Sequence, residues 1–382
     1  MAKSIVVCCD GTWNKADQVS PTNVRKFASA LASTDGFGDV LIPQYFEGVG
    51  VKRAEKWLGG AFGFGLSARV REAYKFLAQH FEPGDRIYLL GFSRGAYTAR
   101  SVAGMIHNVG LLRDDRISEV NLDRAFEIYR DRDDEEKNPD GRIAEEFVDA
   151  NSHRTGIRFI GVWDTVGALG IPLGGLRWLN VVNRRWQFHD TQLSGSVEAA
   201  FHALAIDERR GPFVPTLWDL PCEACLTSGR RVVEQVWFSG VHSNVGGGYR
   251  ETGLSDITLN WLARRAYDHG LRFLPGSLGA TTGWVNVLGT SYPINPATNG
   301  KLVNSRTKFY TLLPEHVRRL GRRKTRFTEA ASSSAQGRWD KDPSYRTATN
   351  LGAYLDSGRA TILSVDDPWD GSSESSAHDE AA

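Results

Sequence analysis

The fold of this chain is decided by the stretch Arg86-Ile87-Tyr88-Leu89-Leu90-Gly91-Phe92-Ser93-Arg94-Gly95. Its first half is mostly apolar and predicts a buried strand. The residues after Gly95 are rich in small side chains and predict a helix. A strand, a sharp turn at Gly-x-Ser-x-Gly and a helix are together the context of a nucleophile elbow.

Ser93 is the candidate nucleophile of this elbow. A serine on such a turn projects its hydroxyl above the sheet, and glycines two positions to either side let strand and helix pack closely. The N-terminus of the following helix also favours developing negative charge. The alternative is a glycine-rich strand–helix corner in some other doubly wound fold.

The rest of the chain alternates short apolar runs with longer helical patterns. This alternation predicts an α/β-hydrolase fold with a mostly parallel central sheet flanked by helices. The expected strands are Ile5–Cys9, Val40–Phe46, Arg86–Gly91, Ile157–Trp163 and Val233–Gly240. The expected helices are Asn23–Ser33, Gly65–Phe81, Gly95–Asn108 and Leu193–Ile206.

We expect one domain over residues 1–365, with helical or lid insertions at about 111–152 and 170–230. The second insertion contains Trp178, Trp186 and Phe188, which either cover a site or belong to the core. The pattern weakens from about Ala266, and the acidic, serine-rich residues 366–382 are predicted to be disordered.

His242 is the candidate general base. It follows an apolar run and enters a glycine-rich loop, so it lies at the carboxyl end of a predicted strand, where catalytic groups of open α/β sheets gather. The other histidines considered lie in or beside predicted helices, where packing or surface roles are commoner: His80, His107, His269 and His316.

The acid that orients this base should lie between serine and histidine in chain order. Asp164 ends the predicted strand Ile157–Trp163 and is favoured. Asp207 is the alternative acid, although its neighbours Arg209 and Arg210 favour an ion pair. The sequence leaves both open.

The oxyanion of an acyl transfer needs two preorganised N–H donors. One is expected from Arg94, directly after the nucleophile, and the other from Gly11 or Thr12, which follow the first strand. Asp10 in the same loop is a further site candidate, with a turn or helix cap as its alternative role. A phosphatase nucleophile would need a second aspartate where Thr12 stands.

Composition excludes some partners. The 382 residues include 46 basic and 45 acidic side chains, so no overall field attracts nucleic acid. The basic run Arg318–Lys324 is expected to be a solvated surface.

The N-terminal sequence lacks a signal peptide, because Ile5–Cys9 is too short for its apolar region. No stretch reaches the ~18 apolar residues of a membrane-spanning helix. We expect a cytoplasmic location, with export as an effector by a route without a cleaved signal left open. The pairs Cys8-Cys9 and Cys222-x-x-Cys225 predict neither a disulfide framework nor a metal site, and no cofactor is expected.

Four motifs together resemble a known family: Asp10–Asn14, Gly91–Arg100, Val162–Gly167 and His242–Tyr249. This is the α/β-hydrolase family of uncharacterised bacterial and fungal proteins that includes the catalytic domains of type VI secretion phospholipase effectors. Further matches are Gly60–Leu66, His202–Arg210 and Phe188–Thr191, which make His189 and Asp190 additional site candidates.

The resemblance covers about residues 4–265 and implies a Ser-Asp-His hydrolase. For secreted members it implies a phospholipase. It places the nucleophile on Ser93 and the base on His242, and it supports an acidic partner without choosing between Asp164 and Asp207. One departure is Asn244, where many members are expected to have aspartate.

Two functions are therefore compared. The first is hydrolysis of carboxylic esters, with lipid esters favoured, through an acyl-enzyme on Ser93. Its partners would be a small ester or lipid substrate and, transiently, a membrane surface; the sequence does not define an oligomeric state. The second is a non-catalytic binding or scaffold protein on the same fold. Nucleotide binding through Gly59–Gly65 is disfavoured, since the run lacks the lysine and serine of a P-loop.

Overall fold

The computed structural model describes residues 2–50, 61–131, 134–167, 193–219, 231–279, 292–321 and 328–365. Several expectations lie outside these ranges: the aromatic residues Trp178, Trp186 and Phe188, the site candidates His189 and Asp190, the pair Cys222 and Cys225, and the tail 366–382.

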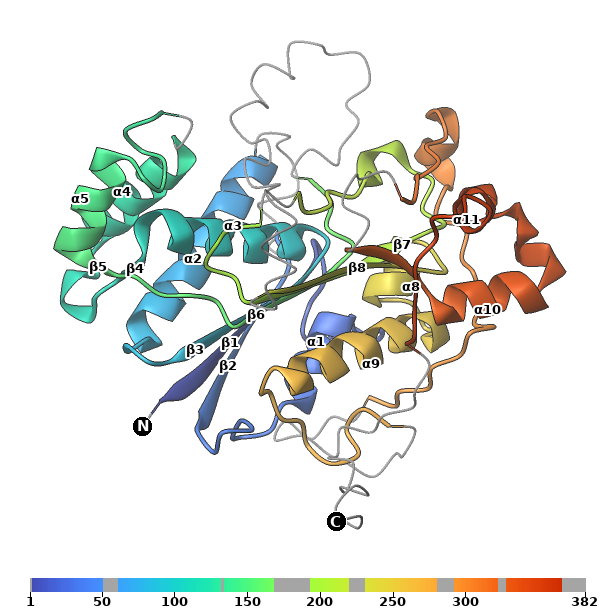
Figure 1. Cartoon of the computed structure of the whole chain (residues 1–382), viewed down its shortest axis with the longest axis horizontal. Coiled ribbons are helices and arrows are strands. Elements are labelled where there is room, and N and C mark those ends of the chain that lie inside the picture. The colour runs from blue at the N-terminus through green and yellow to red at the C-terminus, as the bar shows by residue number, and fades with distance from the viewer. Residues whose placement is uncertain are drawn as a thin grey trace.

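An eight-stranded sheet forms the centre of the molecule, and all of its strand pairings are parallel (Figure 1). Its order is β10-β9-β8-β7-β6-β3-β1-β2. The strands are β1 (Lys3–Cys9), β2 (Val40–Phe46), β3 (Arg86–Phe92), β6 (Phe159–Trp163), β7 (Ala199–Ala205), β8 (Val232–Phe238), β9 (Glu329–Ser332) and β10 (Ile362–Leu363). A separate antiparallel pair joins β4 (Leu111–Leu112) to β5 (Ser152–His153).

Helices cover both faces of this sheet, as expected for an α/β-hydrolase fold (Figure 1). They are α1 (Asn23–Ala30), α2 (Ala61–His80), α3 (Arg94–Val109), α4 (Glu119–Arg130), α5 (Arg142–Asn151), α8 (His242–Gly246), α9 (Gly253–Asp268), α10 (Ser333–Lys341) and α11 (Thr349–Leu355). Single 3₁₀ turns occur at η2 (Asp114–Arg116), η4 (Gly211–Phe213), η5 (Lys308–Leu312) and η6 (Pro343–Thr347). In the described part of the chain, no helix is long and apolar enough to cross a membrane.

Strand β1 shows why the strands of this sheet have continuous apolar sequences. Ile5 and Val7 pack with side chains of α2 and α3, whereas Val6 and Cys8 pack with α1 and α9 on the opposite face. All four side chains are fully buried. Side chains alternate across a strand, so a strand covered on both faces needs apolar residues at every position.

The five expected strands are present with bounds shifted by no more than two residues, but the helix expected over Leu193–Ile206 is wrong. Residues Ala199–Ala205 form β7, which lies between β6 and β8. Four of its seven residues are alanine, whose intrinsic preference is helical. Burial on both faces and hydrogen bonding to two neighbouring strands outweigh that preference here.

The C-terminal part adds β9 and β10 to the sheet edge and a third apolar cluster beside it. That cluster includes Trp237, Ala331, Tyr345 and Leu351. The expectation of a solvated surface is wrong for Arg318, which is only 2% exposed. Leu302 and Leu320, from the described segment 292–321, pack against this cluster, and the same segment carries Arg318 to Asp164 at the carboxyl end of β6.

Candidate active site

Ser93 lies on a strained turn between β3 and α3. Its φ of 58° and ψ of −120° are unfavourable for a residue with a Cβ. Two glycines allow this turn: a Cβ on Gly91 would lie 2.5 Å from the Gly95 carbonyl oxygen, and one on Gly95 would lie 2.1 Å from the Cys9 oxygen. The backbone N–H of Ser93 donates to Trp163 O at 3.0 Å, which fixes the turn against β6.

Backbone strain in the described residues gathers around this serine. Among them, three residues other than glycine have a positive φ: Trp13 (65°), Ser93 (58°) and Asp164 (39°). They come from the loops that follow β1, β3 and β6. Strained residues of this kind cluster at functional sites, where the surrounding structure holds them in place.

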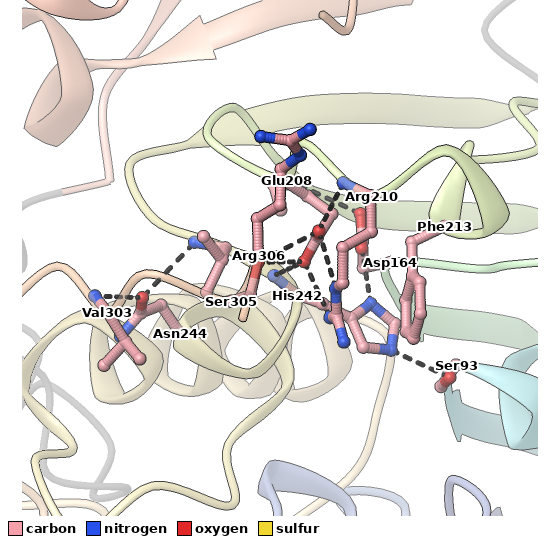
Figure 2. Close-up of polar contacts among 12 residues, drawn as sticks. Ser93, Asp164, Glu208, Arg210, Phe213, His242, Asn244, Val303, Ser305 and Arg306 are labelled. Atoms are coloured by element: carbon pink, nitrogen blue, oxygen red, sulfur yellow. Dashed lines mark hydrogen bonds and ion pairs between the residues drawn. The ribbon is translucent and has the colours of Figure 1, made fainter. Parts of the chain in front are cut away.

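His242 connects Ser93 to Asp164 (Figure 2). Its Nε2 lies 2.8 Å from Ser93 Oγ, and its Nδ1 lies 2.6 Å from Asp164 Oδ2. His242 is the first residue of the short helix α8 rather than part of an irregular loop. Since Nδ1 faces a carboxylate, it carries the proton and leaves Nε2 as the acceptor for the serine hydroxyl.

Of the two candidate acids, the structure brings Asp164 and not Asp207 to the imidazole. Asp207 accepts hydrogen bonds from the Gly240 backbone N–H at 2.6 Å and from Tyr345 Oη at 2.8 Å. Burial raises the pKa of Asp207. Its contacts fix the turn after β8, so Asp207 supports the loop that leads to His242.

Arg318 is a site residue that the sequence did not reveal. Its guanidinium lies 2.7 Å from Asp164 Oδ1 and 3.0 Å from Oδ2, a bidentate pair. Burial raises the pKa of Asp164, but the charge of Arg318 and the hydrogen bond from His242 more than offset it and hold this pKa well below its usual range. In the sequence, Arg318 is only the first residue of a basic run, and such a run typically indicates a solvated surface.

The imidazole of His242 packs against two aromatic rings. The Phe92 ring lies 4.6 Å from it between ring centroids. The Phe213 ring lies 5.0 Å from it at a steep angle (Figure 2). Burial lowers the pKa of His242, and the hydrogen bond and charge of Asp164 compensate only in part. The ring therefore remains neutral, as a general base must be, to a lower pH than a solvated histidine.

A second buried carboxylate, that of Glu208, holds the backbone at His242. Glu208 accepts a hydrogen bond from the His242 N–H at 3.2 Å and from Ser305 Oγ at 3.0 Å. Arg210 pairs with Glu208 at 2.8 Å and lies over the ring of Phe213. The pKa of Glu208 falls to about 2, because its interactions with Arg210 outweigh its burial.

Asn244, the departure from the expected family pattern, connects α8 to the C-terminal part. Its Oδ1 accepts from the N–H groups of Val241 and Val303, and its Nδ2 donates to the Lys301 carbonyl at 3.3 Å (Figure 2). An aspartate could not make the last of these bonds. Asn244 therefore has a structural partner of its own in residues 301–303.

The loop after β1 passes close to Ser93. A Cβ on Gly11 would lie 3.2 Å from the Cβ of Ser93. The Gly11 N–H, however, donates to Asp10 Oδ1 at 2.6 Å. This favours Thr12 over Gly11 as the second oxyanion donor. Arg94 begins α3, where amides point out along the helix axis.

Asp10 fixes that loop instead of facing the reacting serine. Its Oδ2 accepts from Thr22 Oγ1 at 2.5 Å and from Tyr45 Oη at 2.6 Å. Burial raises the pKa of Asp10 to about 6, with these hydrogen bonds acting in the opposite direction. Cys8 and Cys9, just before it in β1, are buried free thiols. Within the described ranges, no three His, Cys, Asp or Glu side chains are grouped as a metal site would require.

Comparison with protein-family models identifies the family of this chain. The model described as the catalytic domain of Tle1-like type VI secretion phospholipase effectors matches residues 3–265. Among curated proteins, the uncharacterized protein YEL023C of Saccharomyces cerevisiae is 32% identical over 249 residues. That match covers 57% of this chain and 34% of the yeast protein, so the chain spans about a third of that relative's length.

Solved structures give more distant matches. An uncharacterized protein from Pseudomonas aeruginosa is 20% identical with a TM-score of 0.40, over 71% of this chain and 47% of that one. An esterase from Thermogutta terrifontis, solved with butyrate bound, is 13% identical with a TM-score of 0.34, over 70% and 83% of the two chains.

Proposed function

The chain belongs to the family of the catalytic domain of Tle1-like type VI secretion phospholipase effectors, and we propose that it is a serine hydrolase of lipid carboxylic esters. The observation that carries this proposal is the position of His242, with Ser93 Oγ at 2.8 Å on one ring nitrogen and Asp164 at 2.6 Å on the other. Ser93, His242 and Asp164 would then act as nucleophile, general base and orienting acid.

In the first half-reaction, Ser93 Oγ attacks the ester carbonyl carbon while His242 Nε2 takes the hydroxyl proton. The carbonyl π electrons move to oxygen, and Asp164 stabilises the imidazolium. The tetrahedral intermediate then collapses, the bond to the alcohol oxygen breaks, and His242 returns the proton to that oxygen. The alcohol leaves, and the acyl group stays on Ser93.

In the second half-reaction, water attacks the acyl carbon and His242 takes its proton. When this intermediate collapses, the bond between the acyl carbon and Ser93 Oγ breaks, and His242 gives its proton to Oγ. The carboxylic acid leaves, and the Ser93 hydroxyl and neutral His242 are restored. In both steps the oxyanion would accept hydrogen bonds from the backbone N–H groups of Arg94 and Thr12. The partial positive charge at the N-terminus of α3 acts in the same direction.

Apolar side chains near the site support a lipid as the substrate. Phe213 packs on His242, and Tyr310 packs on Phe213 with a centroid distance of 6.1 Å. Two apolar residues close in sequence to candidate site residues face solvent: Trp13, next to Thr12, is 58% exposed, and Leu312, two residues after Tyr310, is 81% exposed. Exposed apolar groups of this kind suit an acyl chain presented by a micelle or membrane surface.

The test compares lipid and soluble esters. We expect the wild type to release fatty acid from phosphatidylcholine mixed micelles and alcohol from p-nitrophenyl butyrate. Ser93→Ala and His242→Ala should each lower both rates about 10³-fold or more while circular dichroism shows an unchanged fold. A folded wild type that cleaves neither ester would instead favour the binding or scaffold alternative.

A further inference from the structure

We propose that Arg318 is a positioning residue for this site: it holds the Asp164 carboxylate in place and reduces the negative charge that His242 experiences. The proposal rests on the proposed function. Arg318 lies outside residues 3–265, which match the family model, so the segment 292–321 would complete the active site instead of only extending the fold.

The guanidinium is fixed from several directions. Besides its two contacts to Asp164, Nη1 donates to the Ala205 carbonyl at 2.7 Å and Nη2 donates to the Phe213 carbonyl. Asn350, the second residue of α11, donates from Nδ2 to the backbone carbonyl of Arg318 at 3.1 Å and so holds this segment against the helix. An arginine held this way orients the carboxylate it contacts.

Asp164 needs such an anchor because its backbone is strained, with a φ of 39°. Its own N–H donates to Ala203 O at 2.7 Å, and its Oδ1 accepts from the Ala205 N–H at 3.0 Å. Without Arg318, the second donor to Oδ1 would be lost and a buried carboxylate would face His242 with one backbone partner. A shift of the acid by even 1 Å can cost about 100-fold in rate.

The charge of Arg318 matters as much as its geometry. An unpaired Asp164 would stabilise the imidazolium form of His242 strongly, and Arg318 offsets that attraction. The other buried carboxylate facing His242, Glu208, is likewise paired with Arg210. The charge of Arg210 itself lowers the pKa of His242. The arrangement keeps His242 neutral, and therefore competent as a base, to a lower pH than a solvated histidine.

The experiment measures the protonation of His242 directly by NMR of its ring nitrogens, assigned with His242→Gln. In Arg318→Gln we expect the titration of His242 to move to higher pH by about half a unit or more. Arg318→Lys keeps the positive charge but lacks the planar guanidinium that contacts both oxygens of Asp164. The titration of His242 in this variant should therefore stay close to that in the wild type. The acid limb of kcat/KM for p-nitrophenyl butyrate should move in parallel.

The two variants also separate charge from position. Arg318→Lys should lower kcat about tenfold or more, since one ammonium group cannot hold both carboxylate oxygens. Arg86→Met is the matched control: Arg86 pairs with Asp35 at 2.8 Å at the opposite end of β3, so its loss should lower stability and leave the His242 titration unchanged.

An unmoved His242 titration in folded Arg318→Gln would overturn the charge role, and an unchanged kcat in Arg318→Lys would overturn the positioning role. Should Arg318→Gln fail to fold, the Lys variant alone still decides the second point. Failure of the proposed function is distinguishable, because it appears as an inactive wild type. The NMR titration of His242 measures the effect of Arg318 whether or not the protein hydrolyses esters.

Discussion

The Nε2 atom of His242 lies 2.8 Å from Ser93 Oγ, although 149 residues separate the two in the chain. The contact forms because β3 and β8 are parallel strands of one sheet that end at the same edge, with β6 and β7 between them. Asp164 follows β6 and so reaches the other ring nitrogen. The sheet topology alone therefore brings three residues from three loops to one point, as ligand sites in open α/β sheets require.

The choice between the two acids gives the first prediction. Asp164→Asn should lower kcat about 10³-fold or more, since an amide cannot stabilise the imidazolium or fix its tautomer. Asp207→Asn is the matched change in the alternative acid. Because Asp207 contacts Gly240 and Tyr345 instead of His242, this change should lower the stability of the fold but reduce kcat by less than about tenfold. The measurement is kcat on a short-chain ester beside urea unfolding. The reverse order of the two losses would place the acid at Asp207.

The elbow glycine gives the second prediction. A methyl group on Gly95 would collide with the Cys9 and Asp10 carbonyls, so Gly95→Ala should destabilise the fold by about 2–3 kcal/mol and slow reaction at Ser93. Gly337→Ala is the control, since a Cβ there would meet no atom within 4 Å on the helix α10. That change should be neutral or stabilise by up to about 1 kcal/mol. Equal stability of the two variants in urea would show that the close packing at Gly95 is not needed.

The third prediction concerns the loop that carries Thr12. Asp10→Asn replaces one carboxylate oxygen by an amide donor, which cannot accept a hydrogen bond. The variant therefore loses either the bond from Gly11 to Oδ1 or those from Thr22 and Tyr45 to Oδ2. We expect kcat to fall about tenfold to 100-fold with KM nearly unchanged, as a displaced oxyanion donor would produce. Asp35→Asn is the control at the other end of the sheet, where a buried acid accepts from Ser4 and Arg86. A loss of equal size in Asp35→Asn would indicate a stability effect instead.

The fourth prediction is a pH dependence of stability. Burial lowers the pKa of His202 from 6.5 to about 3 in the folded protein. As the pH falls below 6.5, the unfolded chain binds a proton at His202 that the folded chain does not, so stability is lost toward pH 3.

His202→Gln should remove this contribution, which amounts to about 1.4 kcal/mol per pH unit within that window. The free energy of unfolding should therefore fall less steeply between pH 6 and pH 4 in the variant than in the wild type. Other titrating groups, including Asp10 and His242, are present in both proteins and cancel in the difference. Identical slopes would mean that His202 is protonated in the folded state.

Much of this architecture could be predicted from local patterns. The runs Ile5–Cys9, Arg86–Gly91 and Ile157–Trp163 are mostly apolar, with Arg86 and Arg158 only at their beginnings, because their strands are covered on both faces. That pattern is visible in the sequence. Turn chemistry then located Ser93, Asp164 and His242 as residues at strand ends. These features are short-range, so the residues that encode them are neighbours in the chain.

What could not be predicted depends on distant contacts. The alanine-rich β7 has a helical preference that only its two neighbouring strands override. Arg318 is a basic residue in a basic run, and nothing near it in sequence indicates that Asp164, 154 residues away, will be its partner. The hydrogen bond from the Gly11 N–H to Asp10 Oδ1 likewise depends on a loop geometry that the amino-acid composition does not encode.

The central claim, that Ser93 is a nucleophile activated by His242, is tested most directly by labelling with a fluorophosphonate and mapping the modified residue by mass spectrometry. The account predicts a stoichiometric adduct on Ser93 in the wild type, no adduct in Ser93→Ala, and labelling slowed about 10³-fold in His242→Ala. A folded wild type that remains unlabelled, or an adduct on any residue other than Ser93, would contradict it.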